Sequence, residues 1–272
     1  MPLTACIITR NEEENLPACL ESVSFADEII VVDSHSTDRT RVVAQEFRGR
    51  SLAGRVVEPR VIERDWPGHV EQKNFAIDQA TNDWVLCVDA DERVSLDLRK
   101  EILEILSGEP DADGYTMPRK TFYMGRWVMR GGWYPDRKLR FFRRSKGRWG
   151  GTNPHDHVQL AERIRDLQGE FYHFSYRSLS DHVRTIDFFT DISAKEKFRK
   201  GRRFPRIRMV VQPPFKFFKS YVIQRGFREG TVGFILAVMG MFYVFLKYAK
   251  LWELKMASRD KTGTGLWRGG GS

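Results

Sequence analysis

The sequence has little of what marks a secreted or a membrane-embedded protein. Only three cysteines occur, Cys6, Cys19 and Cys87, too few and too scattered for a disulfide framework or a structural zinc site. The first residues, MPLTACIITRNEEEN, show no basic segment followed by an apolar run, so we expect no signal peptide. The mean hydropathy of −0.46 excludes a polytopic membrane protein. Together these features predict reduced thiols in a cytosolic compartment.

Charge is unevenly distributed along the 272 residues. The whole chain carries a net charge of +9, but residues 195–272 hold 18 lysines and arginines against 4 acidic residues. The remainder, residues 1–194, is slightly acidic. A strongly basic C-terminal segment predicts an anionic partner, either a nucleic acid or phospholipid headgroups.

The first 110 residues alternate between short apolar runs and amphipathic segments. The pattern predicts strands over 3–9, 28–33, 55–62 and 84–88, and helices over 15–22, 36–46, 68–80 and 96–106. This order is typical of an α/β fold with a mostly parallel sheet. Ligands of such sheets bind at the carboxyl ends of the strands, where Asp33 and Asp89–Asp91 are expected.

The rest of the chain changes character twice. Residues 114–195 are rich in aromatic residues, glycine and arginine, and we expect loops, short strands and a few helices that close over the sheet edge. The predicted division is therefore 1–113 and 114–195 for two halves of one domain, followed by a helical tail over 196–272.

The tail contains 17 uncharged residues, 230–246, between basic and aromatic flanks. A spanning helix needs about 20 residues, so we expect a monotopic helix lying in a membrane leaflet. A buried helix, an oligomer contact and a true single span are the alternatives. Residues 262–272 are glycine-rich, and we expect them to be disordered.

The motif with the clearest chemistry is Asp89-Ala90-Asp91-Glu92, directly after a predicted buried strand. Two carboxylates at i and i+2 can face one cleft, and their hard oxygens suit Mg²⁺ or Mn²⁺ bound together with a diphosphate. Because an isolated Asp-x-Asp triplet is common by chance, the surrounding segments decide its weight.

Three segments in order provide that context. They are IITRNEEENL, then VVDSHSTDRT, then QKNFAI followed by DWVLCVDADE. In sequence and spacing they resemble the strand-end motifs of family 2 glycosyltransferases with the GT-A fold. The resemblance covers residues 1–195 well and the tail more loosely. Within the family, the chain is most similar to bacterial lipopolysaccharide-core β-glucosyltransferases.

The resemblance implies a role for each matching residue. It places Thr9, Arg10 and Glu12 along the nucleotide pocket, Asp33 against the nucleobase, Lys73 near the base or phosphates, Asp89 by the ribose or metal, and Asp91 on the metal. Arg10 stands where many relatives carry tyrosine. The residues alone leave other readings open: Asp33 as a helix cap, Glu12 as a solvated side chain, and Lys73 as an ion-pair partner on its own helix.

The second half supplies candidates for catalysis and acceptor binding. An inverting transferase needs a carboxylate to deprotonate the acceptor, and the resemblance of NPHDHV to a His-acid motif makes Asp156 the candidate. His155 or His157 would orient Asp156 or touch the phosphates, and the alternative is a polar loop whose histidines cap a turn. His173 is a candidate third metal ligand, with a core histidine as the alternative. Trp133, Tyr134 and Arg140 are candidates for the acceptor side, although the arginines fit a solvated face equally well.

The resulting prediction is an inverting, metal-dependent glycosyltransferase on the cytoplasmic face of a bacterial inner membrane. It would move a hexose, glucose from UDP-glucose, onto a lipopolysaccharide-core or other envelope glycolipid. A polyprenyl phosphate is the alternative acceptor. A non-enzymatic nucleic-acid or anionic-surface binder fits the charge but leaves the strand-end carboxylates unexplained, so we expect no nucleic-acid partner. A nucleotidyltransferase is disfavoured because TRNEEEN replaces a glycine-rich phosphate loop. Oligomerisation through the tail stays open.

Overall fold

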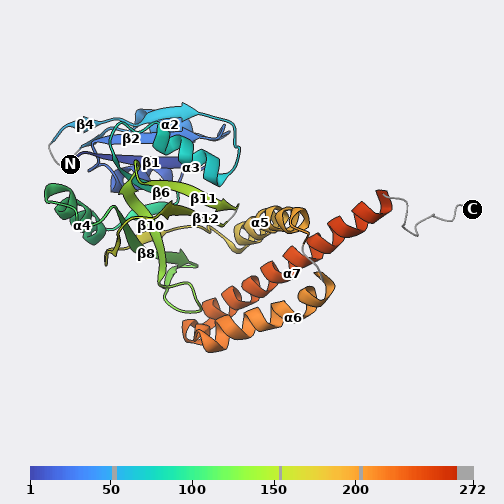
Figure 1. Cartoon of the computed structure of the whole chain (residues 1–272). Helices are drawn as coiled ribbons and strands as arrows, with labels where there is room; N and C mark the ends of the chain where they lie inside the picture. The colour runs from blue at the N-terminus through green and yellow to red at the C-terminus, as the bar shows by residue number, and fades with distance from the viewer. Residues whose placement is uncertain (51–53, 153–154, 202–204, 262–272) are drawn as a thin grey trace, which may run out of the picture. The chain divides into compact units, whose positions relative to one another are not determined.

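The computed structural model describes residues 1–50, 54–152, 155–201 and 205–261, and Figure 1 shows their arrangement into elements. The chain forms two compact units. Unit 1 comprises residues 1–127 and 133–175, and unit 2 comprises residues 128–132 and 176–272. The helix that follows residue 175 therefore belongs to the same unit as the tail.

Unit 1 is built on a ten-stranded sheet whose main path runs β5-β2-β1-β6-β10-β8-β14-β7, with β9 and β13 beside β8. These strands are β1 (Leu3–Thr9), β2 (Glu28–Asp33), β5 (Arg60–Glu63), β6 (Trp84–Asp89), β7 (Glu92–Val94), β8 (Gly114–Tyr123), β9 (Arg126–Val128), β10 (Asp136–Arg143), β13 (Ile164–Asp166) and β14 (Phe171–His173). Two small pairs complete the strands: β3 (Gly49–Arg50) with β4 (Val56–Val57), and β11 (Gly147–Thr152) with β12 (His155–Leu160).

The first half of the sheet is parallel, and its register aligns the strand ends. All seven residues of β1 are buried, as expected of a parallel strand covered on both faces. Thr9 pairs with Asp33 on β2, and Ile8 pairs with Asp89 on β6. The predicted α/β fold with strand-end carboxylates at one edge is therefore confirmed.

Helices cover both faces of this sheet. Alternate residues of β1 enter different clusters, Ala5 and Ile7 on one face, Cys6 and Ile8 on the other. The first face packs against α1 (Leu16–Ser22), α2 (Thr40–Glu46) and α4 (Leu96–Ser107), and the second against α3 (His69–Asp78) and the β11–β12 hairpin. Helix α3 thereby lies over the carboxyl half of β1 and β6, which positions the site.

The expectation of loops and short strands over 114–195 is wrong for β8 and β10. These strands have ten and eight residues and extend the sheet with antiparallel pairing. The arginines of β10 were expected on the acceptor side or on a solvated face. Arg140 and Arg143 instead pair with carboxylates of the neighbouring strands and turns, while Phe141 and Phe142 are fully buried.

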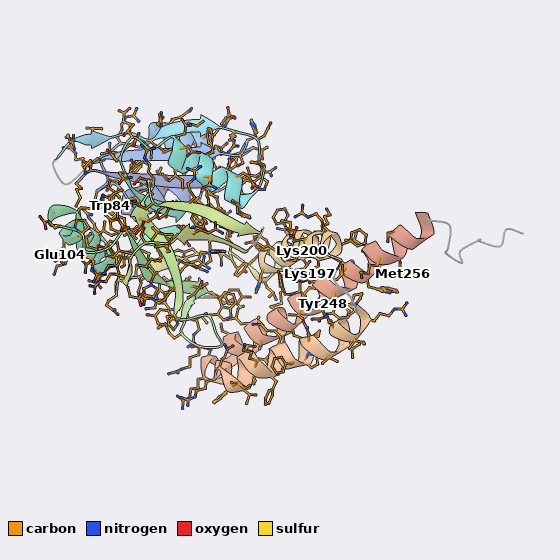
Figure 2. The ribbon with its side chains drawn as sticks, viewed as in Figure 1. Trp84, Glu104, Lys197, Lys200, Tyr248 and Met256 are labelled. Atoms are coloured by element: carbon orange, nitrogen blue, oxygen red, sulfur yellow. The ribbon has the colours of Figure 1, made fainter. Side chains whose placement is uncertain are left out.

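Unit 2 consists mainly of helices. They are α5 (Leu179–Arg199), α6 (Pro205–Phe218), the π-helix η1 (Lys219–Ile223), the 3₁₀-helix η2 (Gly226–Glu229) and α7 (Gly230–Lys261). Helix α7 packs on α5 and α6 through Ala194, Tyr248 and Leu251, joined by Met209 and Val244; Tyr248 is labelled in Figure 2. The segment 128–132 belongs to the same unit and is hydrogen-bonded to η2 and to the residue that follows η1. Gly131 N donates to Gln224 O at 3.0 Å, and Met129 N donates to Glu229 Oε1 at 3.1 Å.

The predicted apolar run 230–246 is part of the much longer helix α7. Among the described residues, one segment, Gly226–Ser258, is long and apolar enough to cross a bilayer by length and composition alone. About a third of its apolar window, 33%, is buried. Residues 262–272, expected to be disordered, lie outside the described residues.

Candidate active site

The strand-end motif forms a tight turn between two strands of the sheet. Strand β6 ends at Asp89, Ala90 and Asp91 make the turn, and β7 begins at Glu92. The backbone amide of Asp89 donates to Glu92 Oε2 at 3.1 Å, and this bond closes the turn. The two aspartates of the motif have separate partners.

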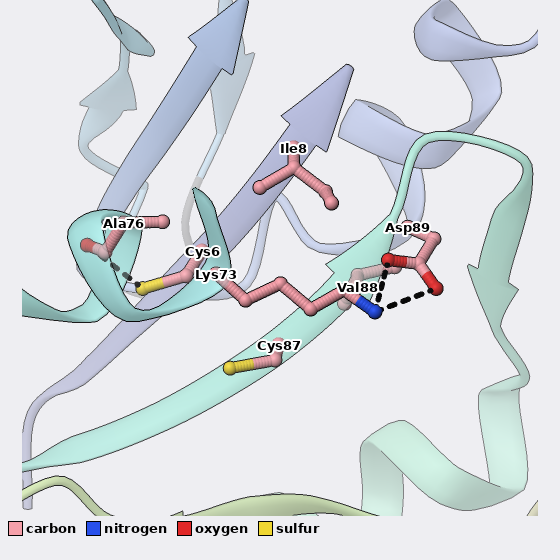
Figure 3. Close-up of a pocket in the computed structure, with 7 residues that line it drawn as sticks. All are labelled: Cys6, Ile8, Lys73, Ala76, Cys87, Val88 and Asp89. Atoms are coloured by element: carbon pink, nitrogen blue, oxygen red, sulfur yellow. Dashed lines mark hydrogen bonds and ion pairs between the residues drawn. The ribbon is translucent and has the colours of Figure 1, made fainter. Parts of the chain in front are cut away.

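Lys73 joins two carboxylates that lie far apart in the sequence. Its ammonium lies 3.2 Å from Asp89 Oδ1 and 2.9 Å from Asp156 Oδ2. Figure 3 shows the Lys73 side chain extending past Cys87 toward Asp89, in a small hollow also lined by Cys6 and Ile8. The indole of Trp149 covers the ammonium at 4.3 Å from the ring centroid. Lys73 side-chain exposure is only 7%, so these contacts form away from bulk water.

Arg140 holds the other side of Asp89. Its Nη2 lies 2.8 Å from Asp89 Oδ2 and 3.5 Å from Glu92 Oε1. Arg119 continues the network by pairing with Glu92 at 3.1 Å and with Asp136 at 2.7 Å. Opposite charges therefore alternate from Asp156 to Asp136. Removing a single partner of a buried ion pair costs about 3–5 kcal/mol of folding stability, so the loss of any one member would destabilise the fold.

Two nitrogens of Arg140 have no partner in this network. Arg140 is 4% exposed, and its Nε and Nη1 are buried without a hydrogen-bond acceptor among the described residues. The hydroxyl of Thr9 at the end of β1 is also buried without a hydrogen-bond partner among the described residues. Buried donors of this kind call for an explanation, and an anionic or polar ligand at the sheet edge is one.

The charges of the network fix the protonation of its carboxylates. Burial alone raises the pKa of Asp89, but the guanidinium of Arg140 and the ammonium of Lys73 outweigh it and hold the pKa well below its ordinary range. Burial likewise raises the pKa of Asp156, and Lys73 reverses that effect and lowers it. Both carboxylates are therefore ionised at neutral pH.

A histidine at the start of α3 adjoins this network. Burial, and then the charge of Lys73, lower the pKa of His69, so that its imidazole is neutral at pH 7. His69 precedes Lys73 by four residues, which places both side chains on the same face of the helix.

Asp91 pairs with His173 instead. Asp91 Oδ2 lies 3.2 Å from His173 Nε2, and the other ring nitrogen lies 3.3 Å from the hydroxyl of Thr121. Sheet register creates this pair, because His173 on β14 lies opposite Glu92 on β7 and Phe174 N donates to Asp91 O at 2.9 Å. Burial raises the pKa of Asp91, but the neighbouring imidazole outweighs it and lowers the pKa.

The Asp91–His173 pair suits a cation that shares its coordination with a ligand. Within residues 1–50, 54–152, 155–201 and 205–261, no group of three or more histidine, cysteine, aspartate or glutamate side chains is arranged to hold a metal alone. Two donors are nevertheless enough for Mg²⁺ or Mn²⁺, which in nucleotide enzymes keep waters and take further oxygens from phosphates. A carboxylate oxygen and an imidazole nitrogen, both at the open strand edge, fit that requirement.

The residues predicted to line the nucleotide pocket lie at the ends of β1 and β2. Arg10 is exposed, and Glu12 Oε2 accepts a hydrogen bond from Asn15 Nδ2 at 2.8 Å. Asp33 is fully buried, and its two oxygens accept bonds from the amide and the hydroxyl of Ser36. Asp33 therefore holds the turn after β2 and does not cap a helix, because α2 begins only at Thr40, after Arg39.

The residues predicted for the acceptor side do not all lie together. Tyr134 donates its hydroxyl to Glu170 Oε1 at 2.8 Å, and Trp133 beside it is half-buried. Arg140 lies in the buried network under Asp89, not on an exposed face. Asp156 lies on β12, whereas Asn153, Pro154 and the side chain of His155 lie outside the described residues.

Several members of the network received no role from the sequence. They are His69, Glu92, Arg119 and Trp149. Two signals were present: Glu92 directly follows the Asp-x-Asp triplet, and His69 shares a helix face with Lys73. The pairing of Arg119 with Asp136 and the cover by Trp149 depend on strand neighbours, which no local pattern shows.

Known glycosyltransferases are similar to this chain in sequence. The family model described as glycosyl transferase family 2 matches residues 4–167. The lipopolysaccharide core biosynthesis glycosyltransferase LpsC of Rhizobium meliloti (strain 1021) is 30% identical over 93% of this chain and 93% of its own length. An uncharacterized glycosyltransferase of Rickettsia bellii (strain RML369-C) is 32% identical over 96% of this chain and 89% of its own length.

A solved structure shows the same fold. The mannosyltransferase PcManGT from Pyrobaculum calidifontis, solved in complex with GDP-Man and Mn²⁺, superposes with a TM-score of 0.52 at 13% identity, over 93% of this chain and 87% of its own. The family match covers more than half of the chain, including Asp89, Asp91 and Asp156 and the strands that present them. The chain is thus a family 2 glycosyltransferase with the GT-A fold, related to enzymes of lipopolysaccharide-core biosynthesis.

Proposed function

We propose that this enzyme transfers a hexose from a nucleoside-diphosphate sugar, UDP-glucose in the first instance, to a hydroxyl of a lipopolysaccharide-core or other envelope glycolipid, with inversion at the anomeric carbon. The observation that carries the proposal is the adjacency of two arrangements at one sheet edge. One is the Asp91–His173 pair, and the other is the network in which Lys73 joins Asp89 to Asp156. The first arrangement could hold the metal ion of a bound diphosphate, and the second contains a carboxylate that could deprotonate an acceptor.

The donor diphosphate would bind among the cations of the network. Arg140 offers two buried nitrogens that have no hydrogen-bond acceptor among the residues that the structure describes. Lys73 offers an ammonium already shared between two carboxylates. A divalent cation held by Asp91 and His173 would offset the charge that develops on the leaving diphosphate. Asp89 would keep Lys73 and Arg140 oriented toward the ribose and phosphates.

The nucleoside would lie across the ends of β1 and β2. Thr9 presents a buried hydroxyl with no hydrogen-bond partner in the described part of the chain, and Arg10 is exposed next to it. A guanidinium plane can stack on a nucleobase. Asp33 would contribute through the turn that it holds as well as by accepting a hydrogen bond from the base, with Glu12 at the rim of the same pocket.

Asp156 is the proposed general base. It is ionised at neutral pH, which is the state that accepts a proton from the acceptor hydroxyl as that hydroxyl attacks the anomeric carbon. While Lys73 lies 2.9 Å away, Asp156 is a weak base. A bound diphosphate competes for the Lys73 ammonium and would make Asp156 more basic at the moment when it is needed.

The acceptor would be lipid-linked, and the enzyme would work at the cytoplasmic face of an inner membrane. Support comes from the relation to LpsC and from the basic, apolar helices of unit 2. Trp133 and Tyr134 would line the acceptor side, since aromatic faces stack on sugar rings. Polyprenyl phosphate is the second candidate acceptor, favoured by the same helices. Family membership favours an enzyme over a non-enzymatic anionic-surface binder.

The test is a transfer assay that varies donor, metal and acceptor independently. UDP-glucose, UDP-N-acetylglucosamine and GDP-mannose would each be supplied with Mn²⁺, with Mg²⁺ or with chelator. Purified lipopolysaccharide core and undecaprenyl phosphate would serve as acceptors. Acceptor-dependent release of UDP with one donor and one metal is the expected result. Failure of every nucleotide-sugar to bind the folded enzyme with metal present would overturn the proposal.

A further inference from the structure

Helix α7, which carries the apolar run, is partly occupied by packing inside unit 2. Leu236, Ala237, Met239, Tyr248 and Leu251 are buried. Tyr248 and Leu251 contact Ala194 of α5, with Met209 of α6 beside them. Lys250 also pairs with Asp187 and Asp191 of α5. The buried third of the apolar window of α7 therefore holds the helices of unit 2 together.

The adjoining segment α6–η1 instead exposes its apolar side chains. Seven of them are between 44% and 68% exposed: Ile207, Val210, Val211, Phe215, Phe218, Val222 and Ile223. The residues at 207, 211, 215, 218 and 222 recur at intervals of three and four, so they form one stripe along the helix. The opposite side is buried through Pro205, Pro213 and Ser220. This stripe is an amphipathic surface with nothing covering it within the described part of the chain.

The charges around the stripe have one sign. From residue 205 to residue 228 the sequence contains six lysines and arginines and no acidic residue. Lys219, Arg225 and Arg228 are exposed, and Arg208 borders the stripe. Apolar side chains flanked by basic ones complement an anionic bilayer surface, where the first enter the acyl boundary and the second face the headgroups.

We infer that the α6–η1 stripe is the surface by which the enzyme binds an anionic phospholipid bilayer, and that the buried side of α7 supports it from within unit 2. The inference rests on the membrane association in the proposed function and names the surface responsible. It places the lipid contact before the apolar run that the sequence suggested. A second copy of the chain is the competing occupant of the stripe, and the test distinguishes it.

The experiment measures co-flotation of the full-length enzyme with vesicles of phosphatidylcholine alone or with added phosphatidylglycerol. The test variant replaces Ile207, Val211, Phe215 and Phe218 with serine. We expect its partitioning to the anionic vesicles to fall at least about tenfold, because each serine removes apolar area that would otherwise enter the bilayer. The matched control replaces Val42, Val56 and Leu96, exposed apolar residues of unit 1, with serine, and should partition like the wild type.

A second measurement avoids dependence on a fourfold variant. The native cysteines Cys6, Cys19 and Cys87 are buried, so an environment-sensitive dye can be attached selectively to Phe215→Cys or, as control, to Leu96→Cys. The dye at 215 should shift to the blue on addition of anionic vesicles, and the dye at 96 should not. A blue shift at 215 without vesicles that grows with protein concentration would assign the stripe to a second copy.

The outcomes separate the inference from the proposed function. Wild-type affinity in the fourfold variant, with no spectral change at 215, would overturn the assignment of the stripe while leaving membrane association intact. Failure of the wild type to bind any anionic vesicle would remove both. Transfer to a water-soluble, delipidated acceptor tests the reaction separately and should be equal in the wild type and the fourfold variant.

Discussion

The ammonium of Lys73 on α3 lies 2.9 Å from the carboxylate of Asp156 on β12, although 83 residues separate them in the sequence. The same ammonium lies 3.2 Å from Asp89, the first acid of the strand-end motif. One side chain thus connects the proposed donor site to the proposed base. This arrangement lets a bound diphosphate influence the basicity of Asp156 through competition for a single cation.

Replacing Lys73 with methionine tests that connection. Without the ammonium, the pKa of Asp156 should rise, because burial then acts on it without a compensating charge. The acid limb of the pH profile of kcat/KM should therefore move to higher pH, and kcat/KM should fall. The free energy of unfolding should fall by about 3 kcal/mol, since Asp156 loses its ion-pair partner Lys73. Lys100→Met, at an exposed position, is the control, and an unmoved acid limb would refute the connection.

Replacing Asp156 with asparagine keeps the shape of the side chain and removes the base. Transfer should fall by about 10²–10⁴-fold, the range that general bases contribute. Binding of the nucleotide-sugar, measured by calorimetry, should persist because Lys73 then pairs with Asp89 alone. Asp97→Asn, an exposed acid at the start of α4, should keep normal turnover. Near-normal transfer by Asp156→Asn would show that the base lies elsewhere.

The Asp91–His173 pair is testable through metal affinity. His173→Ala and Asp91→Asn should each weaken the binding of Mn²⁺ measured by electron paramagnetic resonance with UDP present, by about 10–100-fold, while the sheet stays folded. His157→Ala, which changes an exposed histidine on β12, is the matched control. If Mn²⁺ affinity is unchanged in His173→Ala, the imidazole serves only to pair with Asp91.

Unit 2 contains a buried histidine that links its stability to pH. Burial lowers the pKa of His182 to about 4, and its ring stacks on Tyr176 at 4.0 Å. The unfolded histidine titrates near 6.5. The contribution of His182 to the free energy of unfolding is thus fully present above about pH 6.5. This contribution, about 3 kcal/mol, is lost as the pH falls toward 4. Thermal melts of the wild type and His182→Phe across this range should diverge; parallel curves would contradict the shift.

The sequence by itself determined the first half of the fold and the family. Short apolar runs ending in acids predicted the strands β1, β2 and β6, because buried parallel strands and their polar ends leave a local signature. Asp89 and Asp91 were identified for the same reason, since two acids directly after such a strand are visible without knowledge of any neighbour.

Only the tertiary structure decided which of these residues meet. Strand pairing brought His173 to Asp91, and the packing of α3 beneath the β11–β12 hairpin brought Lys73 to Asp156 under the indole of Trp149. It also placed Arg140 in the interior and exposed the apolar stripe of α6, although α7 is the more apolar segment. Contacts between strands and helices distant in sequence depend on register and packing, and local composition contains neither.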